Sequence, residues 1–425
     1  MNLVEQIKEF YQIANSYELD EFSIYGCLLE RRNVGFQNDL VKFIHFHDDI
    51  KFSFHASYQN QIIRFELKNP SSVDFNAKVA EEISQSKNSV KSSKINFREK
   101  IYNEHFDSNI DNITLNQLIN KAKSLSEIFK KSPFSFGQIL VEKQTEYRVF
   151  ICSKNNILCF EKKNMYFYLS TFLVTKNTED ISISISEVIN QESEEEVSIA
   201  RIIQKINSYE TLILSQSDIN LEPTEIVING DIMSKLLKLA YPKLINILYK
   251  QKDMLSESIT IISNPHLSYG NTGGYFSNEG ELFDVRTLVD RGKVIVRNHI
   301  KDKESFLREW KNPGNLVVVT DEVQAIEKDN PYLVIFDISN VHIKITNSLD
   351  FFVTSQALLM LNKECINTYY NLQVEGNLIS LLQQVQGIDL NTDLYFNFPD
   401  KFSIGSPSIV LKKGFVFNKE RLSIL

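Results

Sequence analysis

The chain has 425 residues, 43% of them hydrophobic and 24% charged, and a formal net charge of −8. That is enough material for two or three buried cores. Because no cluster of Lys and Arg offsets the acidic balance, nucleic acid is not an expected partner, and the lack of any apolar run of 18 residues argues against a membrane span.

The N-terminal segment and the cysteines bear on the compartment. Glu5 and Lys8 interrupt the apolar core that a secretion signal needs. The four cysteines are scattered without zinc-binding spacing; two of them could face each other across a hairpin, although buried free thiols are the commoner arrangement. We therefore expect a cytoplasmic protein in which the cysteines are reduced. They are Cys27, Cys152, Cys159 and Cys365, and the pair that could face each other is Cys152 and Cys159.

The first half of the chain alternates helical and β patterns. Helical spacing predicts helices over residues 3–16 and 75–86, another opened by a capping box of Thr114 and Gln117, and a fourth beginning near Ser193. Alternating apolar runs predict antiparallel meanders, with a turn at Asp48-Asp49. The expected strands are Phe22–Leu29, Lys42–Phe46, Ile50–His55, Gln61–Leu67, Phe136–Val141, Tyr147–Ser153, Ile157–Lys162 and Met165–Val174.

The composition changes near Ser215–Pro223, which predicts domains of residues 1–215 and 216–425. The expected fold class is α+β, with two domains that each pack helices on antiparallel strands. In the second half, helices are predicted at Ile232–Tyr249, with Pro242 inside it, and from Leu378 to Gly387. Residues 350–368 fit helix or strand, and the expected strands are Glu225–Asn229, Ile259–Ser263, Thr287–Val289, Lys293–Val296, Leu316–Thr320, Tyr332–Phe336, Val341–Ile345 and two around Lys412-Lys413-Gly414.

Few residues suggest local chemistry. His45 and His47 alternate on one strand and His55 could join them across the Asp48-Asp49 turn, which would suit a metal, but solvent-facing side chains of a half-buried sheet explain them equally. The run from Tyr269 to Gly274 lacks the Gly-Lys-Ser/Thr ending of a phosphate-binding loop. Neither GxSxG nor HExxH occurs.

Two glycine-containing stretches have a distinctive pattern. In the first, Gly273-Gly274-Tyr275 is followed by Asn278-Glu279-Gly280 and then by the run from Arg286 to Gly292. The second contains Glu375-Gly376-Asn377-Leu378, then Gly405-Ser406-Pro407-Ser408, and a glycine expected in a hairpin, Gly414. Both stretches resemble the TldD/PmbA (TldE) family of modified-peptide metalloproteases, whose Gly-Asn-Leu helix and Gly-Ser-Pro-Ser strand entry match the second stretch.

The resemblance implies which subunit type this chain is. TldD-type chains carry His-Glu-x-x-x-His on a helix of the second half and a Cys near the C-terminus, which hold zinc. Here Lys238, Leu239 and Lys243 stand at the His, Glu and His positions, and Asp393–Leu394 at that of the Cys. By resemblance, the chain is a catalytically silent, TldE-like pseudoenzyme without a cofactor of its own, and zinc is expected in a TldD-like partner.

The function implied by this resemblance is peptide maturation by proteolysis in a chamber formed with the HExxxH-bearing partner. The substrate would be an unfolded or modified peptide bound in extended form through main-chain hydrogen bonds. The loop Ser268–Gly280 is the expected partner or peptide surface, although a structural connection explains it equally. Its candidate residues are Tyr269, Gly273, Gly274, Tyr275, Glu279 and Gly280.

Two other functions remain open. One is an active metallopeptidase with relocated ligands, for which His45, His47 and His266 are candidates. The other is a peptide-binding or scaffold protein without a protease partner, which could assemble as a homodimer.

Overall fold

The structure is a computed structural model, and its described part falls into two compact units that meet in sequence between Ser198 and Ile199. The predicted domain limit at 215/216 stays a prediction; by contacts, most of helix α4 (Glu195–Leu214) groups with the second unit. The described residues are 3–37, 40–59, 61–86, 114–130, 135–153, 157–176, 179–189, 195–214, 221–250, 255–264, 285–296, 306, 315–319, 329–338, 344–388, 395–396, 403–418 and 420–425.

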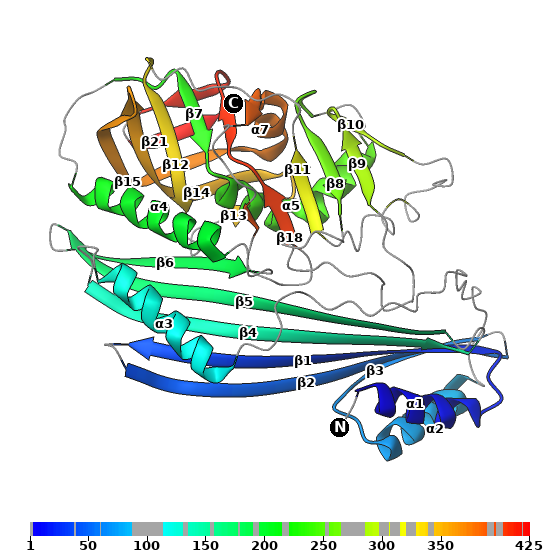
Figure 1. Cartoon of the computed structure of the whole chain (residues 1–425). Coiled ribbons are helices and arrows are strands. Elements are labelled where there is room, and N and C mark those ends of the chain that lie inside the picture. Colours follow the sequence, from blue (N-terminus) through cyan, green and yellow to red (C-terminus); the bar gives the residue numbers. More distant parts are fainter. Residues whose placement is uncertain are drawn as a thin grey trace. The chain divides into compact units, whose positions relative to one another are not determined.

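The first unit is built on one antiparallel sheet with the strand order β3-β2-β1-β4-β5-β6 (Figure 1). Its long strands run side by side over most of their length. Their bounds are β1 (Glu21–Gln37), β2 (Leu40–Tyr58), β3 (Gln61–Lys68), β4 (Ser135–Cys152), β5 (Ile157–Lys176) and β6 (Glu179–Ile189), and the helices of this unit are α1 (Leu3–Asn15), α2 (Ser72–Ser86) and α3 (Leu115–Phe129).

The three helices pack on one face of this sheet. Phe22 and Ile24 of β1 point to that face and join the core formed with α1 and α2, where the rings of Phe10 and Phe75 stack with centroids 4.3 Å apart. Further along the same face, Leu118 of α3 is buried. The expected capping box opens α3, because the Thr114 hydroxyl accepts from Gln117 N–H and the Gln117 amide oxygen accepts from Thr114 N–H.

The predicted turn at Asp48-Asp49 was wrong, because β2 runs straight through both residues. Ion pairs offset the poor fit of aspartate to a strand: Asp48 lies 2.6 Å from Arg32 on β1 and Asp49 lies 2.7 Å from Lys68 on β3. Strands predicted as separate segments on either side of residues 142–146 are likewise one strand, β4.

The second unit contains two sheets with the orders β10-β9-β8-β11-β18-β17 and β16-β19-β7-β12-β14-β15-β21-β20, with β13 paired to β14. Most pairs are antiparallel, but β11–β18, β7–β12 and β15–β21 are parallel, so the α+β class is confirmed with mixed sheets in this half. The helices are α4, α5 (Gly230–Lys250) and α7 (Leu378–Gln384); the strands are β7 (Glu225–Ile228), β8 (Thr260–Ser263), β9 (Arg286–Asp290), β10 (Lys293–Val294), β11 (Asn315–Val319), β12 (Tyr332–Ile338), β13 (Lys344–Ile345), β14 (Asp350–Leu361), β15 (Glu364–Asn377), β16 (Gly387–Ile388), β17 (Tyr395–Phe396), β18 (Ser403–Ser406), β19 (Ile409–Leu411), β20 (Phe415–Phe417) and β21 (Arg421–Ile424).

Helix α5 is the central helix of the second unit. Its apolar residues recur at helical spacing from Ile232 to Leu248 and are buried in the main core of this unit. Pro242 lies on the exposed side, where its carbonyl accepts from the Asn246 side chain at 2.8 Å. No helix in the described part of the chain has the length and apolar character needed to cross a membrane.

The hairpin and helix motifs of this half are largely confirmed. Asp290 pairs with Lys293 across a two-residue turn, and Arg291 and Gly292 both have positive φ, as a tight hairpin requires. Residues 350–368 form strands rather than a helix. The hairpin predicted around Gly414 was wrong, because β19 pairs with β7 and β16 whereas β20 pairs with β21.

Candidate functional site

The positions that the family resemblance assigns to zinc ligands, Lys238, Leu239 and Lys243, lie on α5. Lys238 is half-buried, Leu239 is 52% exposed, and the Lys243 ammonium donates a hydrogen bond of 2.9 Å to the Ile345 carbonyl of β13. A protonated ammonium has no lone pair for a metal, and a leucine side chain has no polar atom. These three residues therefore do not fit a zinc site, and Lys243 has a structural role instead.

No other metal site is present among the residues that the structure describes, where no group of three or more His, Cys, Asp or Glu could hold an ion. The expected Cys position, 393–394, lies outside the described residues, as does His266. The three histidines considered for a metal, His45, His47 and His55, all lie on β2, and the eight residue steps from His47 to His55 span about 26 Å of strand. They cannot share a metal, and His47 instead contacts Asp49 at 2.7 Å.

The N-terminus of α5 carries a charge cluster that links it to α4. Asp231 lies 2.8 Å from Lys235, one turn along α5, and 3.6 Å from Lys205 of α4. Burial opposes ionisation of this carboxyl, but the two lysines outweigh burial and lower its pKa to about 2. An ionised, paired aspartate at the positive end of a helix is a stabilising arrangement rather than a catalytic one.

The face of the first sheet opposite to the helices is rich in charge, which the sequence analysis missed. Arg148 lies 2.8 Å from Glu146 on β4, and the Cys27 thiol of β1 donates to Glu146 at 3.3 Å. Burial raises the pKa of Cys27, and Glu146 raises it further, so this thiol is a poor nucleophile. Burial also raises the pKa of Glu142 despite the nearby Arg31. The alternation of charged and apolar residues along these strands was the signal in the sequence that could have predicted this charged face.

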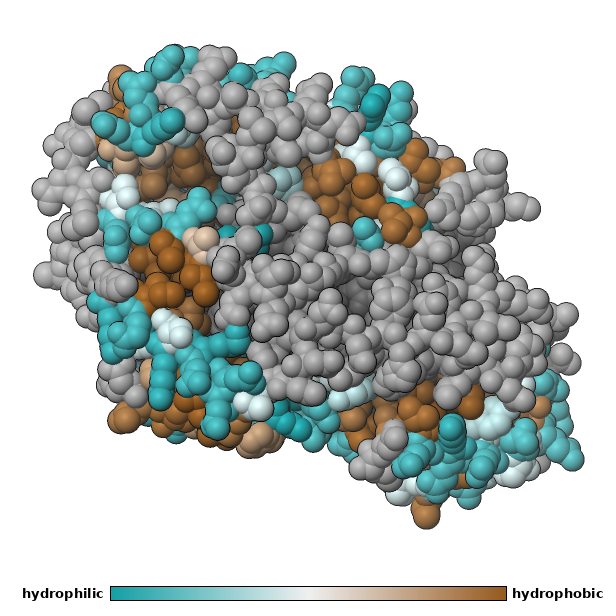
Figure 2. Space-filling model, in the orientation of Figure 1, coloured by the Kyte–Doolittle hydropathy of each residue, from teal (hydrophilic) through white to brown (hydrophobic). Residues whose placement is uncertain are grey.

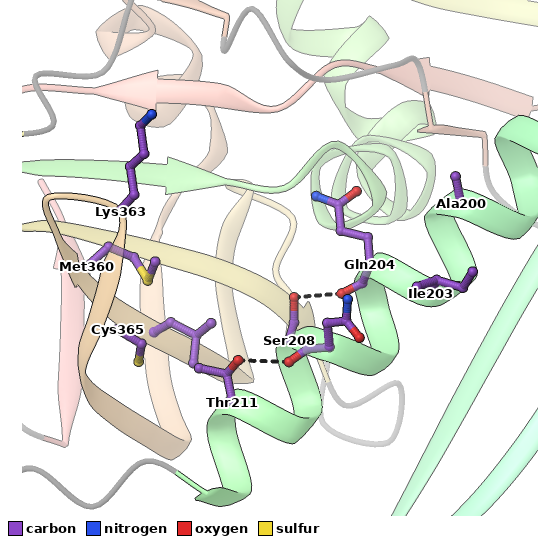
Figure 3. A pocket seen from close by; sticks show the side chains of 10 residues that line it. Ala200, Ile203, Gln204, Ser208, Thr211, Met360, Lys363 and Cys365 are labelled. Atoms are coloured by element: carbon purple, nitrogen blue, oxygen red, sulfur yellow. Dashed lines mark hydrogen bonds between the residues drawn. The ribbon is translucent and has the colours of Figure 1, made fainter. Parts of the chain in front are cut away.

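A groove of about 520 Å³ lies in the second unit between α4 and the turn that joins β14 to β15 (Figure 3). One side of α4 lines it with Ile203, Gln204 and Ser208, and the strands contribute Met360 and Cys365. The Ser208 hydroxyl donates to the Gln204 carbonyl at 3.0 Å and the Cys365 thiol to the Asn367 carbonyl at 3.3 Å. The Lys363 ammonium also lines the groove, together with the Gln204 and Asn207 amides, so the groove offers both apolar and polar contact area.

The loop predicted to face a partner or peptide cannot be placed. Residues 265–284 lie outside the described part of the chain, and with them Tyr269, Gly273, Gly274, Tyr275, Glu279 and Gly280. The described strands on either side, β8 and β9, pair with each other antiparallel. The structure therefore brings together the two strands that the loop joins, and the loop's proposed role stays a prediction.

The two C-terminal motifs occupy structural positions. The Asn377 side-chain oxygen accepts from Ile379 and Ser380 N–H and so caps α7. The Ser408 hydroxyl accepts from Gly230 N–H at 3.2 Å and thereby holds the first residue of α5. Both side chains satisfy backbone donors at the start of a helix, which a buried helix end needs.

Comparison with known proteins shows what this fold is similar to. No protein-family model and no curated protein sequence matches the chain. Solved structures match over nearly the whole chain. A proposed modulator of a DNA gyrase from Thermotoga maritima MSB8 superposes with a TM-score of 0.75 at 13% identity, covering 96% of this chain and 99% of that one.

Two further structures agree. TldE from Thermococcus kodakarensis superposes with a TM-score of 0.71 at 12% identity, and the match covers 96% of this chain and 98% of the TldE chain. A proposed modulator of DNA gyrase from Bacteroides thetaiotaomicron VPI-5482 has a TM-score of 0.69 at 13% identity, with 96% and 97% covered. The chain therefore has the TldE-like fold over nearly its whole length.

Proposed function

We propose that this chain is a non-catalytic, TldE-like subunit of a peptidase, and that a zinc-bearing subunit with an HExxxH motif pairs with it. The observation that carries the proposal is the identity of three residues on α5. In a chain with the TldE-like fold, the helix positions that resemble a zinc motif hold Lys238, Leu239 and Lys243, and Lys243 is engaged with a backbone carbonyl. Neither the metal ligands nor the general base of a zinc peptidase is present on this helix.

In this role the subunit contributes surface rather than chemistry. A chamber wall for unfolded peptides should contact backbone and leave side-chain sequence largely unread. On the charged face of the first sheet, Arg31 has a side chain that is 42% exposed and could make such a contact. The substrate class is an extended, unfolded or modified peptide, and maturation of a secreted modified peptide is the process that would use it.

The test is co-expression of the chain with a HExxxH-bearing protein encoded beside it. We expect the two to co-purify in equal amounts and to cleave unfolded peptide only together, with zinc bound to the partner. The matched control replaces the first His of the partner's motif by Ala, which should abolish cleavage but keep the pair intact. Stoichiometric tightly bound zinc together with peptidase activity in this chain alone would overturn the proposal and favour an active metallopeptidase with relocated ligands.

A peptide-binding or scaffold protein without a protease partner is the second candidate. The groove beside α4 favours it, since the groove offers apolar and polar contact area for a bound peptide. A chain that binds peptide by itself and ignores every HExxxH-bearing neighbour would support this second function.

A further inference from the structure

The first half of β2 forms an open edge of the first sheet. β3 pairs with β2 only from Lys51 to Tyr58, so in the described part of the chain residues 40–49 have β1 as their strand partner and nothing on the other side. Figure 1 shows β2 at the border of the sheet, with β3 beside its other end. We call residues 43–49 the β2 edge.

Backbone hydrogen bonds show which residues of this edge point outward. Ile50 N–H donates to the Asn69 side chain and the Ile50 carbonyl accepts from Asn69 N–H, both at 2.9 Å, so the backbone of Ile50 faces away from β1. Directions alternate along a regular antiparallel strand. The N–H and C=O groups of Ile44, Phe46 and Asp48 therefore face outward too.

The edge has two natural limits. The register between β1 and β2 passes from Gly35↔Phe43 to Phe36↔Val41, so Lys42 is skipped and marks a bulge at one limit. Asn69 occupies the outward groups of Ile50 at the other. The seven residues between these limits, 43–49, pair with β1 without interruption. Phe46 is the middle residue of the seven, and it is 62% exposed. In Figure 2, hydrophobic residues reach the lower-left border of the view, where Figure 1 draws one end of the first sheet.

The edge is complementary to itself. Its first flank is basic at Lys42, its middle is apolar at Ile44 and Phe46, and its far end is acidic at Asp48 and Asp49. Antiparallel pairing of two copies about Phe46 places Lys42 of each diagonally across from Asp48 of the other, which also pairs with Arg32 of its own copy and keeps a side chain that is 52% exposed. Natural sheets usually protect an exposed edge with charges along it, but here the charges lie at the ends and leave an apolar centre.

Hydrogen-bond geometry restricts the register of such a pair. Two opposed residues can exchange hydrogen bonds only if the backbone groups of both point outward, and on this edge those are the even-numbered residues. The two-fold axis must therefore lie level with a residue of the strand and not between two consecutive residues. An axis at Phe46 opposes Ile44 with Asp48 of the other copy and uses all three outward-facing residues of each chain. An axis at His45 would instead oppose Asp48 with the bulged Lys42 and lose regular bonds.

We propose that this chain forms a two-fold symmetric dimer with a second copy of itself through antiparallel pairing of the β2 edges about Phe46. The contact is isologous, so it closes at two copies instead of propagating into a fibre. It continues the first sheet from one copy into the other. This surface lies outside the residues that carry the proposed peptidase role, and the dimer needs no partner subunit.

Disulfide cross-linking tests the register. With the axis at Phe46, residue 45 of one copy opposes residue 47 of the other in a close pair whose Cα atoms are about 4.5 Å apart. A mixture of His45→Cys and His47→Cys proteins should cross-link on mild oxidation. Each variant alone places its two thiols about 8 Å apart between Cα atoms, beyond disulfide reach, and is the matched control. Both histidines are exposed, so the substitutions leave the core intact.

Charge reversal tests the proposed end contacts by sedimentation equilibrium of the full chain. Lys42→Asp places a like charge diagonally across from Asp48 of the other copy at both ends, and should raise the dimer dissociation constant about tenfold. Lys51→Asp is the control, because Lys51 lies on the same strand where β3 already covers it, and should change nothing.

The outcomes that overturn the proposal are equally specific. They are a chain that stays monomeric at its highest soluble concentration, a dimer that resists Lys42→Asp, or cross-linking of either single-cysteine variant as efficient as that of the mixture. Each is measured on the purified chain alone, so failure of this proposal is distinguishable from failure of the proposed peptidase role.

Discussion

At the scale of single residues, the motifs that carry the family resemblance are structural in this chain. Asn377 caps α7, Ser408 holds the start of α5, and Gly292 forms the hairpin turn with a positive φ. A Cβ on Gly292 would lie 2.4 Å from the Leu255 carbonyl oxygen, so only glycine fits there. These residues therefore maintain the fold.

Asn377 is the best residue on which to test this structural role. Its oxygen caps α7 and its amide donates to the Ser348 carbonyl and to Asp350, both at 2.8 Å. We expect Asn377→Ala to lower the free energy of unfolding by about 2 kcal/mol, from the lost cap and the unpaired groups. Urea denaturation followed by circular dichroism measures this loss, and an unchanged midpoint would contradict it.

Asn377→Asp separates the cap from the amide bonds. The aspartate keeps an acceptor for the helix but places a second carboxylate beside Asp350, whose pKa the Asn377 amide normally helps to lower. Repulsion should raise the pKa values of the pair, and carboxyls with raised pKa values bind protons more tightly in the folded state. The variant should therefore be less stable than the natural protein at pH 7 and recover as the pH falls through about 4.

At the scale of elements, the sequence predicts where helices and strands occur better than how long the strands are. Helical spacing located α5 within two residues at each end, and the capping box located α3. The break predicted at Asp48-Asp49 failed because ion pairs with Arg32 and Lys68 stabilise both aspartates within the sheet. Such pairs join strands distant in sequence, so local propensity cannot reveal them.

The candidate site was predictable to the same degree. That Lys238, Leu239 and Lys243 lie on one helix follows from sequence alone, but the hydrogen bond from Lys243 to the Ile345 carbonyl joins two separate elements and needed the fold. The β2 edge was missed for a similar reason. Which half of a strand lacks a neighbour depends on the length of β3.

The contact between α4 and α5 gives a prediction at this scale. Asp231→Asn removes the charge that Lys235 and Lys205 share, and should cost about 2 kcal/mol at pH 7. Because the pKa of Asp231 is lowered in the folded state, its contribution is complete above the ordinary value near 4 and is lost as the pH falls toward 2. The stability difference between variant and natural protein should therefore vanish near pH 2 in thermal or denaturant unfolding.

The control for this prediction is Asp290→Asn, which removes an exposed carboxylate in the β9–β10 hairpin. It should leave stability within about 0.5 kcal/mol of the natural protein. A difference for Asp231→Asn that persists unchanged at low pH would show that its side chain acts through hydrogen bonding alone and not through charge.

At the scale of the whole molecule, the chain has the TldE-like fold, and both proposals give it an association with another chain. The predicted surface for the zinc-bearing partner is the loop of residues 268–280, which lies outside the described residues, whereas the proposed homodimer uses the β2 edge of the first unit. A subunit that associates through both would bring two partner chains, with two zinc sites, into one assembly.

Separate surfaces imply that one association can be weakened without the other. Lys42→Asp should lower the fraction of homodimer and yet co-purify with the HExxxH-bearing partner in equal amounts, with peptide cleavage per zinc unchanged. Light scattering coupled to size exclusion would then give half the mass of the natural assembly. The reason is electrostatic screening: at ordinary salt the charge of residue 42 affects other charges only within about 10 Å, so the substitution should change contacts at the β2 edge alone. Loss of the partner together with the homodimer would mean that the β2 edge is the surface through which the peptidase subunits pair.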